Sequence, residues 1–275
     1  MTQPIRVRRP HPARGQRPVA AVAALFGLFL GLPVVALVAR ALLDGSLGRA
    51  ISSRVVLDAL GLSLVTTAIS LVITVALGLP LAFVLARRSF RGKGWIEAIV
   101  DLPIVLPPSV AGLALLLVFG RRGLLSQPLE GLGISVPFTT IAVILAQTFV
   151  SAPFFIRSAR TGIASVDPDL EDAARVDGAS EGQLFRAITV PLASAALAAG
   201  LVMTWARSLG EFGATIMFAG NVEGRTQTLP LVVYAEFQGG DLDASVAAAA
   251  ILVLAAFGVL IAVRVFGWGR LLESR

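Results

Sequence analysis

The sequence predicts an all-α, polytopic membrane protein, and two observations support that class. Of the 275 residues, 56% are hydrophobic and 15% charged, with a mean hydropathy of +0.84. Soluble domains have roughly 45–50% apolar and about 25% charged residues. The apolar residues also gather into stretches of about 20 or more, the helical length that crosses a hydrocarbon core. Six transmembrane helices are predicted: Val19–Leu43, Asp58–Ala86, Trp95–Phe119, Pro137–Ala159, Leu192–Phe218 and Ala244–Phe266.

The first stretch follows a basic tail at residues 1–18. It is longer than the roughly 7–15-residue core of a signal peptide, and no convincing small-residue cleavage site follows, so we expect a retained span. No linker or low-complexity tract sets a soluble domain apart. Residues 19–275 are therefore predicted to form one transmembrane domain.

The third stretch contains Pro103, Pro107 and Pro108 near its start. Proline breaks the helical hydrogen-bond ladder, so this segment is predicted to be kinked or locally unwound. Broken backbone at membrane depth is tolerated where it is buried in protein or lines a cavity. The prolines therefore indicate either a packing kink or a position beside a pathway.

The fifth stretch carries two charges, Arg207 and Glu211. Residues four apart share one face of a helix, so the two side chains could pair. A charge at the bilayer centre costs about 2.5–3.5 kcal/mol, so such residues usually face a bundle interior or an aqueous path. The pair is either a structural clamp between helices or, with the neighbouring Gly210 and Gly213, part of an anion's path.

Between the fourth and fifth stretches lies a polar segment, which we call the 161–191 loop. Asp167 followed by Pro168 is typical of a helix start. Gly178 is predicted to end this first short helix in a left-handed turn. Ser180 and Gln183 form a capping-box pattern that opens a second helix. The loop suits docking of another protein, or packing as an amphipathic loop on its own bundle.

The distribution of basic residues predicts the orientation. With the N-terminus inside, 16 of the 23 basic residues fall on cytoplasmic segments and six on outer loops, with Arg207 within a span. This bias places both termini and the 161–191 loop in the cytoplasm. The net charge of +6 is accounted for in this way, so we expect lipid and no nucleic acid as partner.

Several kinds of chemistry are excluded. The chain has no cysteine, and its only histidine, His11, lies in the basic tail, so no metal centre, thiol nucleophile or histidine-based catalytic group is expected. A phosphate-binding loop needs a lysine followed by serine or threonine. The only lysine, Lys93, is followed by Gly94. We therefore expect no catalytic residue, no metal and no cofactor in this chain.

The 161–191 loop carries a family resemblance. Asp172-Ala173-Ala174, three residues, Gly178, nine residues and Ile188-x-Val190-Pro191 resemble the Glu-Ala-Ala loop of ATP-binding-cassette importer permeases. Asp172 replaces the family's glutamate, with Glu171 just before it, and Val190 replaces a leucine. The resemblance implies the type I importer permease fold and a loop that couples to an ATPase. The implied ATPase-coupling residues are Glu171, Asp172, Ala173, Ala174, Gly178 and Pro191.

That resemblance also implies partners. An ATPase subunit dimer would bind ATP and Mg in the cytoplasm, and an extracytoplasmic binding protein would deliver an oxyanion to outer loops around Asn221–Gly240. Most homo-oligomers close as symmetric pairs, so we expect a homodimer with the pathway on its two-fold axis. The expected location is the cytoplasmic membrane of a prokaryote.

A narrower resemblance concerns the substrate. The run from Arg207 to Asn221, with Thr226-Gln227-Thr228, is similar to the fifth span and outer loop of molybdate importer permeases. Sulfate and thiosulfate permeases share the Gly-Glu-Phe/Tyr-Gly part and often have the extra first span. The resemblance implies molybdate, with tungstate and sulfate or thiosulfate as alternatives. The implied pathway residues are Arg207, Gly210, Glu211, Gly213, Pro107 and Pro108.

Two other classes make different predictions. An ion-coupled secondary transporter would use Glu211 as its titrating carboxylate and would work without a partner. A membrane scaffold without transport would need Arg207 and Glu211 for assembly and would show no flux. The 161–191 loop favours the importer over both.

Overall fold

The computed structural model describes residues 16–272, with side chains described for residues 19–261. This part of the chain is built from helices and contains no strand. The basic tail predicted at residues 1–18, and the basic residues Arg264, Arg270 and Arg275, lie outside the residues whose side chains are described. Their contribution to the orientation stays a prediction.

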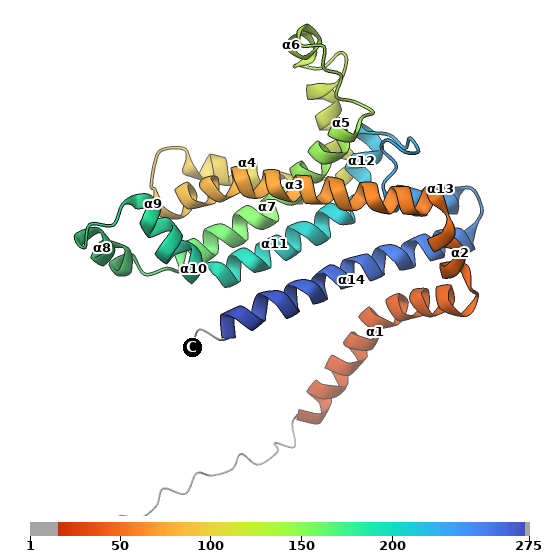
Figure 1. The fold of residues 1–275 in the computed structure, drawn as a ribbon, viewed down its shortest axis with the longest axis horizontal. Helices are drawn as coiled ribbons and strands as arrows, with labels where there is room; N and C mark the ends of the chain where they lie inside the picture. The colour runs from red at the N-terminus through yellow and green to blue at the C-terminus, as the bar shows by residue number, and fades with distance from the viewer. Residues whose placement is uncertain (1–15, 273–275) are drawn as a thin grey trace, which may run out of the picture.

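Five helices form most of the molecule, and all but the first run along its long axis (Figure 1). They are α1 Gln16–Leu43, α3 Arg54–Arg87, α7 Thr140–Ala164, α11 Ser194–Leu209 and α14 Leu242–Leu272. Helix α7 packs against both α3 and α11, whereas α1 contacts mainly α14 and diverges from the bundle. Helices α1, α3, α7 and α14 are each long and apolar enough to cross a membrane. Two bent helix pairs, one over residues 93–119 and one over residues 181–209, bring the number of candidate spans to six if each pair is counted as one span.

Small residues allow α7 and α11 to approach closely. A Cβ atom on Gly162 would collide with Ala196 Cβ, and one on Gly200 would lie 2.9 Å from Ser158 Cβ. Ser158 also donates its hydroxyl to the carbonyl of Ala196 at 2.6 Å. Small residues and hydroxyl bonds replace the hydrophobic driving force that is missing between helices in lipid.

Helix α3 presents a buried hydroxyl face to its neighbours. The hydroxyl of Ser70 accepts from Thr148 of α7 at 3.1 Å and from Ser208 of α11 at 3.4 Å. Nearer its N-terminal end, Ser63 Oγ accepts from the backbone N–H of Leu229 at 2.8 Å. Residues three, four and seven apart share one helix face, so the serines and threonines of α3 line one seam of the bundle.

The two ends of the bundle are closed by short helices. At one end lie α8 Pro168–Val176, α9 Glu181–Leu184, the π-helical turn η1 Phe185–Thr189 and α10 Val190–Leu192 (Figure 1). At the other end lie α2 Ser46–Ser52 and α13 Leu229–Gln238. The expected outer loop around Asn221–Gly240 is therefore partly helical. Leu229 and Val232 of α13 are buried in a core cluster with residues of α14.

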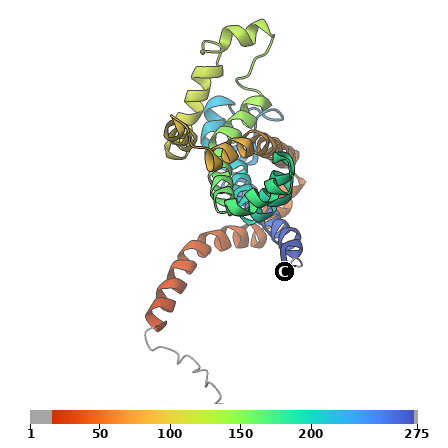
Figure 2. The same ribbon diagram turned by 90° about the vertical axis from the view of Figure 1, so that its left-hand side faces the viewer.

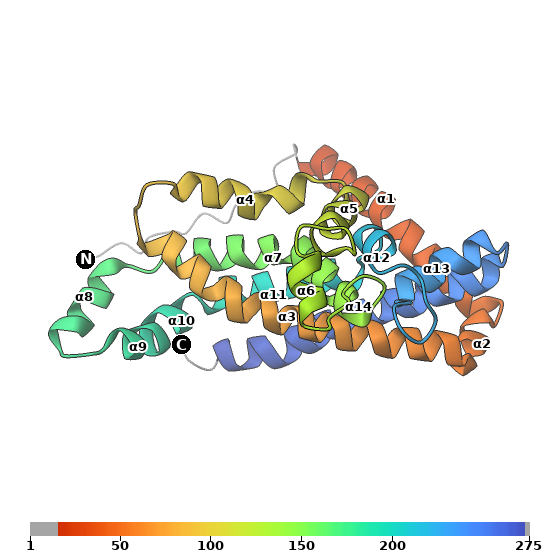
Figure 3. The same ribbon diagram turned by 90° about the horizontal axis from the view of Figure 1, so that it is seen from above.

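The predicted third span, Trp95–Phe119, is not one continuous helix. It is divided into α4 Lys93–Val105 and α5 Pro108–Phe119, and the chain bends by 119° between them. The kink expected from the prolines is confirmed, and it is sharp enough to send the two helices in different directions. Helix α4 lies along the bundle, while α5 and α6 Ser126–Gly131 form an arm that projects away from it, opposite α1 (Figures 2 and 3).

The predicted fifth span, Leu192–Phe218, was wrong as a single helix. Helix α11 ends at Leu209, and a separate helix, α12, runs over Gly213–Phe218. The other four spans were placed correctly, with ends that differ by a few residues. The 161–191 loop is shorter than predicted because α7 continues to Ala164.

Candidate functional site

The first helix of the 161–191 loop, α8, begins at the residues that the sequence predicts. Asp167 is the N-cap of α8 and accepts a hydrogen bond from the backbone N–H of Asp169 at 3.0 Å, and Pro168 fills the first helical position. The predicted helix start is therefore confirmed. Proline at this position loses nothing, because the first N–H groups of a helix have no partner within the helix.

Gly178 ends α8 in the left-handed conformation, with φ of 88°. The N–H of Gly178 donates to the carbonyl of Arg175 at 3.1 Å, and that of Ala179 donates to Ala174 at 2.9 Å. These two bonds form a Schellman motif, in which glycine is preferred because a Cβ atom is strained at positive φ. A Cβ atom on Gly178 would meet nothing within 4 Å, so only backbone strain, and not space, requires glycine in this chain.

The second helix of the loop begins with the predicted capping box. The backbone N–H of Ser180 donates to Gln183 Oε1 at 2.8 Å, and the N–H of Gln183 donates to Ser180 Oγ at 3.4 Å. Two N–H groups that lack partners in the helix are thus satisfied reciprocally.

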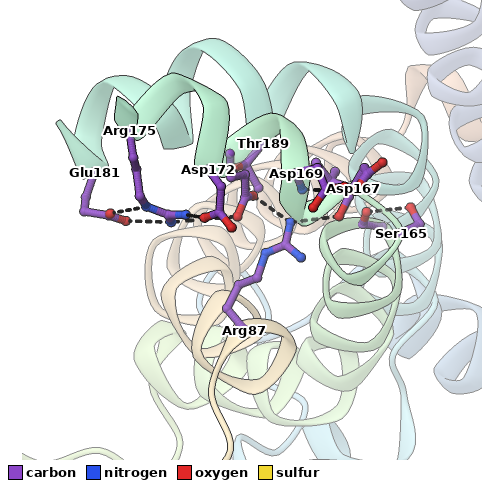
Figure 4. A network of polar contacts seen from close by, with 11 residues as sticks. Arg87, Ser165, Asp167, Asp169, Asp172, Arg175, Glu181 and Thr189 are labelled. Carbon is purple, nitrogen blue, oxygen red and sulfur yellow. Dashed lines mark hydrogen bonds and ion pairs between the residues drawn. The ribbon is translucent and has the colours of Figure 1, made fainter. Parts of the chain in front are cut away.

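Arg175 clamps the two helices of the loop together across the Gly178 turn (Figure 4). Its Nε lies 2.8 Å from Glu181 Oε1 on α9, and its Nη1 lies 2.6 Å from Asp172 Oδ1 on α8. The hydrogen bond from Arg175 lowers the pKa of the Glu181 carboxyl below its ordinary value. The hydrogen bond to Glu181 likewise raises the pKa of Arg175.

The two acidic residues of the predicted coupling motif point to opposite sides. The Asp172 side chain is 70% exposed, whereas Glu171 is 4% exposed. Glu171 Oε1 lies 2.6 Å from Arg87 Nη2 at the end of α3 and accepts from the hydroxyl of Thr189 at 2.9 Å. Of the predicted coupling residues, Asp172, Ala173 and Gly178 are therefore open to a partner, and Glu171 is an internal anchor.

The remaining two predicted coupling residues differ in exposure. Ala174 is half-buried on α8. Pro191 is exposed and lies in α10, the short helix that follows the π-helical turn η1. Leu184 and Thr189, on either side of Phe185, are buried, so this half of the loop packs on the bundle. The packing interpretation therefore holds for this half of the loop, and docking on the exposed face of α8 stays a prediction.

The predicted pair of Arg207 and Glu211 is formed, although not on one helix face. Arg207 lies in the last turn of α11, and Glu211 lies beyond its end. Arg207 Nη1 and Glu211 Oε2 are 2.5 Å apart, but they are not aligned for a hydrogen bond. Glu211 Oε1 accepts from the N–H of Ala214 at 2.7 Å. The Glu211 side chain, 1% exposed, therefore holds the break between α11 and α12 together.

The break in the fifth stretch lies against the break in the third. A Cβ atom on Gly213 would lie 2.7 Å from Pro108 Cβ, so these two predicted pathway residues are brought together. One turn further along α5, a Cβ atom on Gly112 would lie 2.6 Å from the carbonyl oxygen of Ala214. Helices α5 and α12 thus pack backbone to backbone. The predicted pathway residues Pro107, Pro108 and Gly210 remain exposed at this double break.

Two ion pairs and the anchor Arg87 were missed by sequence reasoning. Arg160 Nη2 lies 3.1 Å from Glu97 Oε1, and Arg157 Nε lies 3.6 Å from Asp101 Oδ1, so α4 is tied to α7. Spacing offered a signal: Glu97 and Asp101 are four apart, and Arg157 and Arg160 three apart, so each pair shares a helix face. Arg87 carried no local signal, because Glu171 is 84 residues away.

The residues from 78 to 275 match the family described as the binding-protein-dependent transport system inner membrane component. The solved structure of a bacterial transporter that imports the acidic polysaccharide alginate has the same fold, with a TM-score of 0.74 at 18% identity over 90% of this chain and 93% of that chain. An amino acid transporter structure gives a TM-score of 0.56 at 19% identity, over 80% and 96% of the two chains. The helical fold and the family match define a permease of this transport class, and the chain belongs to the family.

Its curated relatives are more specific. The molybdenum transport system permease protein ModB of Mycobacterium tuberculosis is 45% identical over 205 residues, which cover 74% of this chain and 77% of that protein. A probable molybdenum transporter permease of Haloferax volcanii is 40% identical over 87% of this chain and 86% of its own length. The ModB protein of Escherichia coli K12 is 38% identical over 67% and 82%.

Proposed function

We propose that this chain is the membrane-spanning permease subunit of an ATP-binding-cassette importer that takes up molybdate. The observation that carries the proposal is the 161–191 loop, because its capped, glycine-hinged shape is present in a chain 45% identical to a molybdenum permease. The protein is a multi-pass component of the inner membrane. Its own part is translocation, and ATP hydrolysis with its ATP and Mg belongs to a partner subunit dimer.

The exposed face of α8 suits docking of the partner ATPase. Leu170 and Val176 are 50% and 87% exposed, and Ala173 between them is also exposed. These three residues are three apart along the helix, so they share one face. Exposed apolar residues next to the charged Asp172 suit a groove with an apolar floor and a basic rim. With this loop in the cytoplasm, both termini lie on the same side.

The double break of α4–α5 and α11–α12 is the proposed wall of the translocation pathway. Irregular backbone at membrane depth is tolerated where it borders a cavity. Pro107, Pro108 and Gly210 are exposed at this double break, and the half-buried Arg207, paired with Glu211, lies three residues before Gly210. A second copy of the chain would supply the opposite wall. An extracytoplasmic binding protein would deliver the oxyanion at the end of the bundle that holds α2 and α13.

The test is transport in vesicles that contain the chain, the ATPase subunit and the binding protein. We expect radiolabelled molybdate to enter only with ATP on the ATPase side, and uptake to survive a proton ionophore. Uptake without the ATPase, or its loss with the ionophore while ATP remains, would instead support the ion-coupled class. Sulfate and tungstate as competitors separate the oxyanions, and preference for sulfate would overturn the substrate.

The docking role of the loop is tested by Gly178→Trp. Positive φ disfavours any side chain by about 1–2 kcal/mol, and the large ring would project into the open space around Gly178. We expect ATP hydrolysis to continue while molybdate uptake is lost. Gly182→Trp is the control, because Gly182 is also exposed and open but lies within α9 at ordinary φ. Unchanged uptake in Gly178→Trp would count against docking by this turn.

A further inference from the structure

The loop meets the transmembrane bundle at one buried ion pair. Arg87, the last residue of α3, places its Nη2 2.6 Å from Glu171 Oε1 and 3.2 Å from the carbonyl oxygen of Val166. Thr189 of η1 donates to the same Glu171 oxygen. A single carboxylate oxygen thus joins the end of α3, the helix α8 and the returning segment η1. Figure 4 shows Arg87 reaching from below toward the loop.

From this geometry we propose that Arg87 and Glu171 are positioning residues that carry movement of the 161–191 loop to span α3, an inference that rests on the proposed function. Their pairing would make the loop and the span move together when the ATPase closes. Neither residue needs to touch the ATPase or the substrate for this role.

The ion pair matters because little else links α8 to α3. A groove of ≈ 510 Å³ separates the end of α3 from α8 and α9, and both Arg87 and Glu171 line it. Helix α8 packs mainly against α9 and η1. Among the described residues, no other ion pair joins α3 to the loop. A movement of α8 therefore reaches α3 directly through this pair. The indirect routes are η1, where Phe185 packs edge-on against Phe83 with ring centroids 5.3 Å apart, and α7, which precedes α8 and packs along α3.

Helix α3 is suited to pass such a movement on. Its 34 residues span about 51 Å at 1.5 Å per residue. Its middle is bonded to α7 and α11 through Ser70, and Ser63 accepts from the N–H of Leu229, where α13 begins. Figure 1 shows α3 running from the loop at one end to α13 at the other. A continuous helix that is bonded to its neighbours at several points along its length is a physical link of the kind that can carry coupling between distant sites.

The ion pair between Arg87 and Glu171 is sensitive to substitution because both side chains are largely buried. The Arg87 and Glu171 side chains are 15% and 4% exposed. Removing one partner of a buried pair leaves the other charge unpaired, which is more costly than never having had the pair. Glu171 differs in this from its neighbour Asp172, whose carboxylate is exposed and is paired only with Arg175 within the loop.

The experiment measures molybdate uptake and ATP hydrolysis on the same vesicles, with the complete complex. In Arg87→Gln and Glu171→Gln, we expect hydrolysis to continue and the molybdate taken up per ATP to fall about 2- to 30-fold, the range that changes in coupling usually span. Arg87→Lys should remain close to wild type, because a single nitrogen of Arg87 makes both contacts. Arg88→Gln is the matched control, since it removes the same charge one residue later from an exposed side chain.

Several outcomes would overturn the proposal. An unchanged ratio in both Gln variants would do so, and so would an equal loss in Arg88→Gln, which would point to surface charge. If the single variants do not assemble, the proposal is tested with the double variant Arg87→Gln/Glu171→Gln, because it leaves no unpaired charge. A reduced uptake of molybdate per ATP supports the coupling role of Arg87 and Glu171, whereas a normal value or failure to assemble overturns it. A wild-type complex without ATP-driven uptake would instead refute the proposed function.

Discussion

At the scale of single residues, charged side chains with more than one partner give the 161–191 loop its shape. Arg175 joins Asp172 on α8 to Glu181 on α9, and Glu171 joins Arg87 to Thr189. The first set is exposed and therefore holds only the two loop helices to each other. The second is buried and fixes the loop to the bundle. Shape and attachment thus depend on different side chains.

The Arg175 clamp predicts a pH dependence. Because the hydrogen bond from Arg175 lowers the pKa of Glu181 below 4.5, the clamp is fully present above about that pH and is lost as pH falls through the lowered pKa. We expect carboxyl ¹³C NMR in lipid nanodiscs to show Glu181 titrating below 4.5, with Glu181→Gln assigning the signal. In Arg175→Gln the pKa should rise back toward its ordinary value. A Glu181 signal that does not change in Arg175→Gln would contradict the clamp.

Sequence reasoning succeeded for residues whose partners are local. The caps at Asp167, Gly178 and Ser180 depend on neighbours within a few positions, so their residue types were enough to predict them. Burial could not be predicted in the same way: Glu171 and Asp172 are adjacent acids, yet one faces the bundle and the other faces outward. The helical phase of α8 and the position of Arg87 decide this, and both belong to the tertiary structure.

At the scale of elements, the contact of α5 with α12 depends on two glycines, which have no side chain to keep the helices apart. Gly112 and Gly213 let the backbones of the two broken stretches touch. The prolines predicted the first break, because Pro107 and Pro108 have no backbone N–H with which to continue the hydrogen bonds of a helix. The second break follows a glycine, and Glu211 holds it by a bond to Ala214 that a sequence pattern of helical spacing does not anticipate.

Gly112→Ala should separate α5 from α12. Its Cβ would lie 2.6 and 2.8 Å from backbone atoms of Ala214, which have no room to yield. Overpacking of this kind costs about 1–3 kcal/mol, so we expect a lower melting temperature in detergent and weaker molybdate uptake. Gly61→Ala is the matched control, because a Cβ at this helical glycine meets nothing within 4 Å. Equal melting temperatures of the two variants would argue against close packing of α5 on α12.

At the scale of the whole molecule, large apolar surfaces remain uncovered. Leu25 and Phe29 of α1 are 70% and 69% exposed, and α1 leaves the bundle on the side opposite the α5–α6 arm (Figure 2). Composition was enough to predict a membrane protein, since lipid must cover such surfaces. The orientation depends on the membrane and the two-fold axis on a second copy of the chain, so both stay predictions.

The predicted homodimer can be tested by cross-linking, because the chain has no cysteine and any introduced thiol is unique. Ser109→Cys places a thiol on an exposed residue beside Pro108, at the proposed pathway wall. On a two-fold axis, two copies would form a disulfide-linked dimer under mild oxidation. Ser180→Cys, on the exposed 161–191 loop, should not cross-link, because each loop would lie in its own ATPase groove. Absence of the Ser109→Cys dimer, with a monomeric mass in detergent, would contradict the pathway at a symmetric interface.

The π-helical turn before Pro191 changes the helical phase near the end of the loop, shortly before the span that follows it. In an α-helix the Pro191 ring would crowd the carbonyl of Ala187, and here the wider turn lets Val190 N–H donate to Phe185, five residues back. One extra residue in a turn offsets everything beyond it by about 100°. Thr189, the last residue of the wide turn, donates its hydroxyl to Glu171. The chain then bends by 74° between Leu192 and Ser194, so this single imino acid stands just before the corner at which the loop becomes the membrane helix.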